Sequence, residues 1–289
     1  MATSDALAIG RLGLADVAAG LALSGAADWN QSADDWAFFM TQGEVFGVRD
    51  DAGRVVATAA ALPYEGGFGW ISMVLVDVEH RHRGVASSLL QTCVAALRRA
   101  ARIPVLDATP AGAEVYRRSG FIAGFEFERW ERQEVGADPV VASRRSAADG
   151  PVEARRDADV DDLVALDAAA QRVGRALLLR AFVGRAGTRA WLASARDGFA
   201  IARAGRRATH LGPIVAARTA DALALVEMAL ATTAGRVFID VPARASTLAR
   251  RLEQHGFVRQ RPFVRMALGD AALLSADLRM FALAGPEFG

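Results

Sequence analysis

The sequence contains no lysine, and all 34 of its basic side chains are arginines. We attribute this bias to genome composition; one consequence is that the chain has no lysine side chain to acylate. Cys93 is the only cysteine, which excludes an intrachain disulfide and a cysteine-ligated zinc site and favours a reducing compartment. No apolar run approaches the roughly 18 residues of a membrane-spanning helix, and the first residues lack the pattern of a secretory signal. We therefore expect a soluble, cytoplasmic protein.

The chain also lacks a substantial net charge, because its 34 basic and 33 acidic side chains nearly balance: the formal net charge is +1 and the sequence pI is near 8.0. Such a chain has no broad positive field for binding nucleic acids or membrane surfaces, so we expect neither as a partner. With 289 residues, 52% of them hydrophobic, the chain exceeds the usual ~100–200 residues of one domain. Two domains are expected, and the sequence leaves the oligomeric state open.

A basic turn in the first part of the chain carries the clearest signal of a binding site. The run VDVEHRHRGVASSLL (76–90) joins a predicted strand, FGWISMVLV, to a predicted amphipathic helix that begins at Val85. Gly84 lets a ligand approach the backbone, while the free amides of the first helical turn and the flanking arginines favour an anion such as a diphosphate. The spacing matches neither a nucleoside-triphosphate loop nor a dinucleotide-binding fingerprint. The alternative is a solvated basic turn that only caps the helix.

The order of predicted elements occurs twice along the chain. Each half is expected to contain a strand, two helices, three strands, a helix, a strand, a helix and a final strand. Similar sequences occur near the end of the two halves, VYRRSGF in the first and LARRLEQHGF in the second. The stretch 136–151, rich in small and polar residues, is the predicted linker. We therefore predict a duplicated α/β (α+β) fold with domains at 1–135 (the first half) and 152–268 (the second half). A C-terminal tail, 269–289, is apolar enough to dock on a domain.

Two stretches together resemble one known family. The run VLVDVEHRHRGVASSLL, with its R-x-x-G-x-A core at Arg81, Gly84 and Ala86, is similar to the loop with which the GNAT superfamily of N-acetyltransferases binds the pyrophosphate of acyl-coenzyme A (acyl-CoA). LDATPAGAEVYRRSGF (106–121) resembles the strand and helix that follow in that family. The resemblance implies two tandem GNAT-like domains, each a mixed, mostly antiparallel sheet flanked by helices. It also implies acetyl-CoA as the acyl donor.

The resemblance further implies a set of site residues. Strand Val74–Val76 is expected to separate from the strand that begins near Val105, so that its free backbone groups hold the pantetheine arm and polarise the thioester carbonyl. Tyr116 takes the family's position for the group that gives a proton to the departing thiolate. The residues expected to bind the donor are Val74, Leu75, Val76, Arg81, His82, Arg83, Gly84, Val85, Ala86, Ser87 and Thr109.

The general base and the acceptor pocket are less defined. Asp107 lies beside the expected cleft, but it has an alternative use in hydrogen bonding the backbone, and a water relay would serve equally, so the base stays unassigned. Trp29, Trp36 and Phe39 are candidate acceptor contacts, although most such aromatic side chains belong to a core. In place of the basic turn, the second half reads HLGPIVAARTADALALVEM, without R-x-x-G-x-A. We expect it not to bind acyl-CoA productively, and to complete the acceptor pocket or pack against the first half.

The most direct hypothesis is an acyl-CoA-dependent N-acetyltransferase that acylates a primary amine of a small molecule or peptide. The alternative is a non-catalytic acyl-CoA sensor or interaction module: Tyr116 favours catalysis, whereas the lack of an obvious base keeps the sensor open. A nucleic-acid-binding domain that uses the basic turn is a third hypothesis, which the absence of a wider basic face disfavours. His80 and His82 have no clustered carboxylate or further histidine nearby, so we expect no metal.

Overall fold

The computed structural model describes residues 8–133, 150–153, 157–171, 173–269, 277 and 279–289. By its contacts the chain divides into two compact units, Met1–Val105 (unit 1) and Leu106–Gly289 (unit 2). The division falls inside one strand, β5 (Ile103–Ala108). Most of the predicted linker, 136–151, lies outside the described residues.

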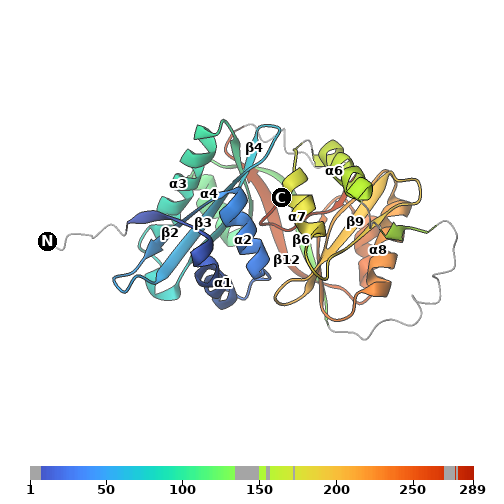
Figure 1. The fold of residues 1–289 in the computed structure, drawn as a ribbon, viewed down its shortest axis with the longest axis horizontal. Helices are drawn as coiled ribbons and strands as arrows, with labels where there is room; N and C mark the ends of the chain where they lie inside the picture. The colour runs from blue at the N-terminus through green and yellow to red at the C-terminus, as the bar shows by residue number, and fades with distance from the viewer. Residues whose placement is uncertain (1–7, 134–149, 154–156, 172, 270–276, 278) are drawn as a thin grey trace. The chain divides into compact units, whose positions relative to one another are not determined.

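Unit 1 is a sheet of antiparallel strands with helices packed on it (Figure 1). Its strand order is β1-β2-β3-β4-β5, and only the last of these pairings, β4 with β5, is parallel. The elements that precede β5 are β1 (Ile9–Leu12), the 3-10 turn η1 (Leu14–Asp16), α1 (Val17–Ala26), α2 (Ala33–Gln42), β2 (Glu44–Arg49), β3 (Val55–Pro63), β4 (Phe68–Val76), the 3-10 turn η2 (Val78–His80) and α3 (Val85–Arg99).

Local sequence determines where these helices begin and which side they bury. Ser32 caps α2: its Oγ accepts the amide of Asp35 at 3.3 Å, and the Asp35 carboxylate accepts the amide of Ser32 at 2.8 Å. Both donors would otherwise lack an intrahelical partner. On α3, Leu89, Cys93 and Leu97 recur at every fourth position and are buried. The amphipathic helix that the sequence predicted is therefore confirmed, and in the structure it packs against β3 and β4.

Unit 2 continues the strand order from β5 as β12-β6-β11-β10-β9-β8-β7, with β13 also paired to β10. Its elements after β5 are α4 (Pro110–Arg118), β6 (Ile122–Arg132), β7 (Val152–Glu153), α6 (Asp157–Gln171), α7 (Ala176–Val183), β8 (Arg189–Leu192), β9 (Gly198–Arg203), β10 (Thr209–Ala216), α8 (Thr219–Thr232), β11 (Val237–Pro242), α9 (Ser246–Gln254), β12 (Val258–Ala267) and β13 (Met280–Ala282). Apart from the 3-10 turns η1 and η2, the series of strands and α-helices from β7 to β12 repeats the series from β1 to β6 in the same order. The predicted repeat of the element order is therefore confirmed.

The final strands of the two halves are exchanged within unit 2. Strand β6, from the first half, pairs antiparallel with β11, and β12, from the second half, lies between β5 and β6. Strands β6 and β12 run antiparallel with Phe127 opposite Phe263, whose stacked rings are 5.1 Å apart. These strands are equivalent members of the repeat, so each half contributes its final strand to the same pairing.

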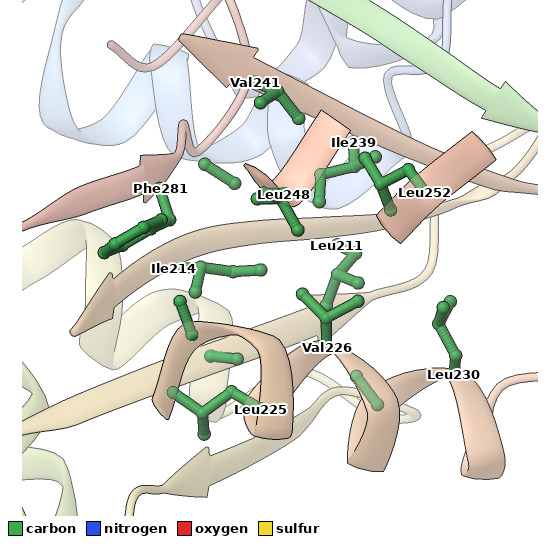
Figure 2. Packing of buried hydrophobic residues seen from close by; sticks show 14 of the residues in the cluster. Leu211, Ile214, Leu225, Val226, Leu230, Ile239, Val241, Leu248, Leu252 and Phe281 are labelled. Atoms are coloured by element: carbon green, nitrogen blue, oxygen red, sulfur yellow. The ribbon is translucent and has the colours of Figure 1, made fainter. Parts of the chain in front are cut away.

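The main core of unit 2 lies between its sheet and helices α8 and α9 (Figure 2). Aliphatic side chains from both helices meet those of β10 and β11 there, and burying each of them contributes roughly 1.5–3 kcal/mol. The labelled members in Figure 2 are Leu211, Ile214, Leu225, Val226, Leu230, Ile239, Val241, Leu248, Leu252 and Phe281. Over the described ranges of the chain, no helix is both long and apolar enough to cross a membrane.

Candidate functional site

The basic turn that the sequence singled out is exposed and leads directly into α3. Strand β4 ends at Val76 and η2 follows it. Arg81 Nε donates to the Val76 carbonyl at 3.1 Å, and this bond ties the turn to the end of the strand. The exposed residues of the turn are Arg81, His82, Arg83 and Gly84.

The backbone of the turn has the shape of an anion site. His82 and Gly84 both lie in the left-handed region, with φ of 61° and 77°. Left-handed residues in a turn direct neighbouring N–H groups into a concavity, and His82 adopts this conformation at an energetic cost because it has a side chain. The first intrahelical bond of α3 runs from the Ser88 amide to the Gly84 carbonyl, so the amides of residues 85–87 precede it. A Cβ on Gly84 would meet no atom within 4 Å.

Strand β4 is irregular at the residues expected to face the thioester. Its register with β3 shifts beside Thr58, and Met73 has a φ of 53°. The Thr58 hydroxyl donates to the Met73 carbonyl at 2.9 Å and holds this bulge. A bulge disrupts the ladder locally, here at Met73 and Val74, while Leu75 and Val76 pair with Thr58 and Ala57 of β3. The described pairing of β4 with β5 covers Phe68–Trp70 and thus precedes the bulge.

Thr109 and Tyr116 lie on α4 in unit 2, whereas the basic turn belongs to unit 1. Thr109 caps α4, and its Oγ1 accepts the Gly112 amide at 3.3 Å. Tyr116 is partly exposed, and its ring centroid is 6.0 Å from that of Phe121. A Cβ on Gly112 would lie 3.2 Å from the Tyr116 ring, so the glycine leaves room for the ring. The roles expected of Thr109 and Tyr116 toward the acyl donor stay predictions.

Asp107, one of the candidate bases, forms a buried ion pair. Its two carboxylate oxygens accept hydrogen bonds from Nε and Nη2 of Arg265, each at 2.8 Å. The side chains are 0% and 3% exposed, respectively. A two-bond pair of this kind is among the stronger polar contacts in proteins. Asp107 therefore anchors β5 to the exchanged strand β12.

The same arrangement occurs at the equivalent place of the second half. Arg129, on β6, binds both oxygens of Asp240, on β11, at 2.8 Å. Burial by itself would lower the pKa of Arg129, but the adjacent Asp240 outweighs burial and the pKa is raised. The likeness of Asp107 and Asp240 was visible in the sequence, in LDATP and IDVP. Their arginine partners were not, because each arginine comes from an exchanged strand more than a hundred residues away.

The aromatic residues proposed as acceptor contacts differ in exposure. Trp36 and Phe39 are both 0% exposed, with ring centroids 6.2 Å apart. The Trp36 indole donates to the Ser24 hydroxyl at 3.1 Å and lies against Gly20 of α1, so it joins α2 to α1. Trp29, between the two helices, is partly exposed. Of the three, Trp29 is the one with surface to offer an acceptor.

Two features of the described ranges concern metal binding and thiol chemistry. No group of three or more His, Cys, Asp or Glu side chains there is arranged to hold a metal ion. Cys93 is fully buried in α3, and burial raises the pKa of its thiol. The thiol is therefore unsuited to carry an acyl group.

Two family models match the chain, and both describe an acetyltransferase (GNAT) domain. One matches residues 41–123 and the other residues 163–282, so one match lies in each half. A search of curated proteins finds no match.

Solved structures of similar fold extend over nearly the whole chain. A crystal structure of a candidate acetyltransferase from Pyrococcus horikoshii is 17% identical, covers 100% of this chain and 98% of its own, and has a TM-score of 0.79. A tandem GNAT protein from the clavulanic acid biosynthesis pathway is 17% identical, covers 91% and 99%, and has a TM-score of 0.66. A GCN5-related N-acetyltransferase from Sphaerobacter thermophilus is 14% identical, covers 96% and 100%, and has a TM-score of 0.61. At these identities the likeness is one of fold.

Proposed function

Because the chain belongs to the GNAT acetyltransferase family and contains two such domains in tandem, we propose that its first half transfers an acetyl or other acyl group from acyl-CoA to a primary amine. One observation carries this proposal: an exposed basic turn with left-handed backbone at His82 and Gly84 directly precedes α3, and the space beside Gly84 is open. Amides at a helix start, beside arginines, bind phosphate groups without further machinery.

Each part of the turn has a role in holding the donor. The amides of residues 85–87 bind the diphosphate, and the guanidinium groups of Arg81 and Arg83 add positive charge. Arg81 also keeps the turn attached to β4 through the Val76 carbonyl. Val74–Val76, which lie at the bulge and directly after it, supply backbone groups for the pantetheine arm and a donor for the thioester oxygen.

The donor supplies an activated acyl group, and the chain's own residues handle protons and orientation. The amine nitrogen forms a bond to the acyl carbon while the carbon–sulfur bond breaks, and the thiolate that leaves takes a proton. Tyr116 gives this proton in our proposal. Asp107 is engaged by Arg265 and has a structural role, so the base that receives the ammonium proton is a group or a relayed water still to be identified.

The anion site is tested by two matched substitutions at Gly84. Gly84→Asn and Gly84→Asp add side chains of nearly equal size, in open space, and both types tolerate a left-handed backbone better than most residues. Only aspartate adds a negative charge, and at about 5 Å from a phosphate this repulsion is worth roughly 1–3 kcal/mol. Calorimetry with acetyl-CoA should show binding to Gly84→Asp that is about 5- to 150-fold weaker than to Gly84→Asn. Equal affinities for the two variants would mean that the phosphates bind elsewhere.

Turnover separates an enzyme from a sensor. Free thiol released from acetyl-CoA is followed against a panel of small-molecule and peptide amines, with wild type and Tyr116→Phe in parallel. An enzyme releases thiol with at least one amine, and Tyr116→Phe lowers kcat about 100-fold or more while acetyl-CoA binding persists. Tight binding without turnover across a broad panel would instead support the non-catalytic sensor.

A further inference from the structure

The chain's own C-terminal residues lie between two strands of the second half. Strands β10 and β11 occupy the same places in the repeat as β4 and β5, and their parallel pairing covers only the start of each strand in the described ladder. Beyond it, β13 enters and pairs antiparallel with β10, Ile214 opposite Ala282. On its other side, the Leu283 amide donates to the Asp240 carbonyl of β11 at 2.9 Å. Residues 279–289, the C-terminal segment, thus bridge the two strands.

Polar side chains of the second half bind the backbone of this segment. Arg203 Nη2 donates to the Ala284 carbonyl at 2.8 Å and to Glu287 Oε1 at 3.2 Å. His210 Nε2 lies 3.2 Å from the Leu283 carbonyl oxygen. Arg203 and His210 are each 1% exposed, so these contacts are made inside the protein.

The segment is also packed as part of the core. Phe281 enters the cluster formed by the sheet, α8 and α9, on the same side as Ile214 (Figure 2). Met280 and Leu283 pack instead with the stacked rings of β6 and β12. At Gly212 of β10, an added Cβ would lie 2.0 Å from the Leu283 carbonyl oxygen. The backbone of the segment therefore takes the space that a side chain would need.

The start of α8 differs from the start of α3 in charge. Arg218 occupies the N-cap position of α8 without a side-chain capping bond, and Asp221 in the first turn accepts a hydrogen bond from Arg218 Nε at 2.7 Å. The Asp221 carboxylate there complements the helix dipole and engages the Arg218 guanidinium, so it competes with a phosphate for both. The first turn of α3, by contrast, contains no acidic residue.

We infer that the C-terminal segment is a built-in strand which takes, in the second half, the place that the pantetheine arm of acyl-CoA takes beside β4 in the first. This inference rests on the function proposed for the first half. The second half is then closed by its own chain and acts as a scaffold that supplies the exchanged strand β12. The chain binds one acyl-CoA.

Stoichiometry gives the first test. Coenzyme A is titrated into the full chain by calorimetry, with wild type and Gly84→Asp in parallel. One site per chain in wild type, lost or strongly weakened in Gly84→Asp, supports the inference. Two sites in wild type, one of them retained with unchanged affinity in Gly84→Asp, would place a ligand in the second half and overturn the inference. A single site that Gly84→Asp leaves unchanged would refute the proposed anion site instead. Absence of any binding to wild type would refute the proposed function, and the second test then decides on the segment alone.

Hydrogen exchange on the full chain gives the second test. The amides of residues 280–284 should exchange on the order of 100-fold more slowly than unstructured backbone, and coenzyme A should leave their rates unchanged while it protects residues 84–88. Gly212→Ala should speed exchange at 280–284 by displacing the segment. Gly235→Ala is the control, because it also adds a side chain at positive φ but meets no atom within 4 Å. Fast exchange of 280–284 in wild type, or faster exchange on adding coenzyme A, would overturn the inference.

Discussion

Replacing Arg265 with methionine tests whether the exchanged strand β12 holds β5 in place. Arg265 and Asp107 share two hydrogen bonds of 2.8 Å, and their side chains are 3% and 0% exposed. Arg265→Met keeps much of the apolar stem but leaves the Asp107 carboxylate buried without the guanidinium. Breaking a buried pair in this way costs about 3–5 kcal/mol. Because a domain has only about 5–15 kcal/mol of net stability, the loss should be plain in a urea unfolding curve at pH 7.

A double-mutant cycle distinguishes loss of the pair from loss of packing. Asp107→Leu with Arg265→Met removes both charges, so the double variant should be at least about 2 kcal/mol more stable than the sum of the single effects predicts. The equivalent cycle on Arg129 and Asp240 is an internal replicate, since that pair has the same geometry. Additive effects in the first cycle, or a cost below about 1 kcal/mol for Arg265→Met, would refute the anchoring role.

Two further predictions concern stability. Burial lowers the pKa of His210 to about 3 from 6.5. The folded state then binds this proton less readily than the unfolded state, so the stabilisation is complete above pH 6.5 and is lost toward pH 3, at up to about 1.4 kcal/mol per pH unit. The free energy of unfolding should fall more steeply from pH 6.5 to 5 in wild type than in His210→Gln, and equal slopes would contradict this. Gly20→Ala places a Cβ 2.6 Å from the Trp36 ring and should cost about 1–3 kcal/mol. Gly25→Ala, in the same helix but in open space, should gain up to about 1 kcal/mol; thermal unfolding that ranks the two variants equally would show that α1 adjusts around Trp36.

The repeat of elements and the exposed basic turn before α3 could be predicted from the sequence because both depend on short-range patterns. Leu89, Cys93 and Leu97 define the buried side of α3 by their spacing, and Ser32 with Asp35 defines the start of α2. The left-handed backbone at Gly84 follows from the one residue type that adopts it without a steric cost. Trp36 and Phe39 were harder to assign, since an aromatic residue between two helices has the same sequence pattern in a core and in a pocket.

The sequence by itself thus determined the order of strands and helices, the duplication and the basic turn before α3. Only the tertiary structure decided which strands pair. Strands β6 and β12 are equivalent in the repeat, so their hydrophobic patterns allow either to lie beside β5 or β11; the observed choice joins Arg265 to Asp107 and Arg129 to Asp240. The tertiary structure also decided that the C-terminal segment enters between β10 and β11. Partners so distant along the chain leave no local signal. They are selected by the ion pairs and backbone hydrogen bonds that buried groups require, and these contacts form only when the whole sheet has assembled.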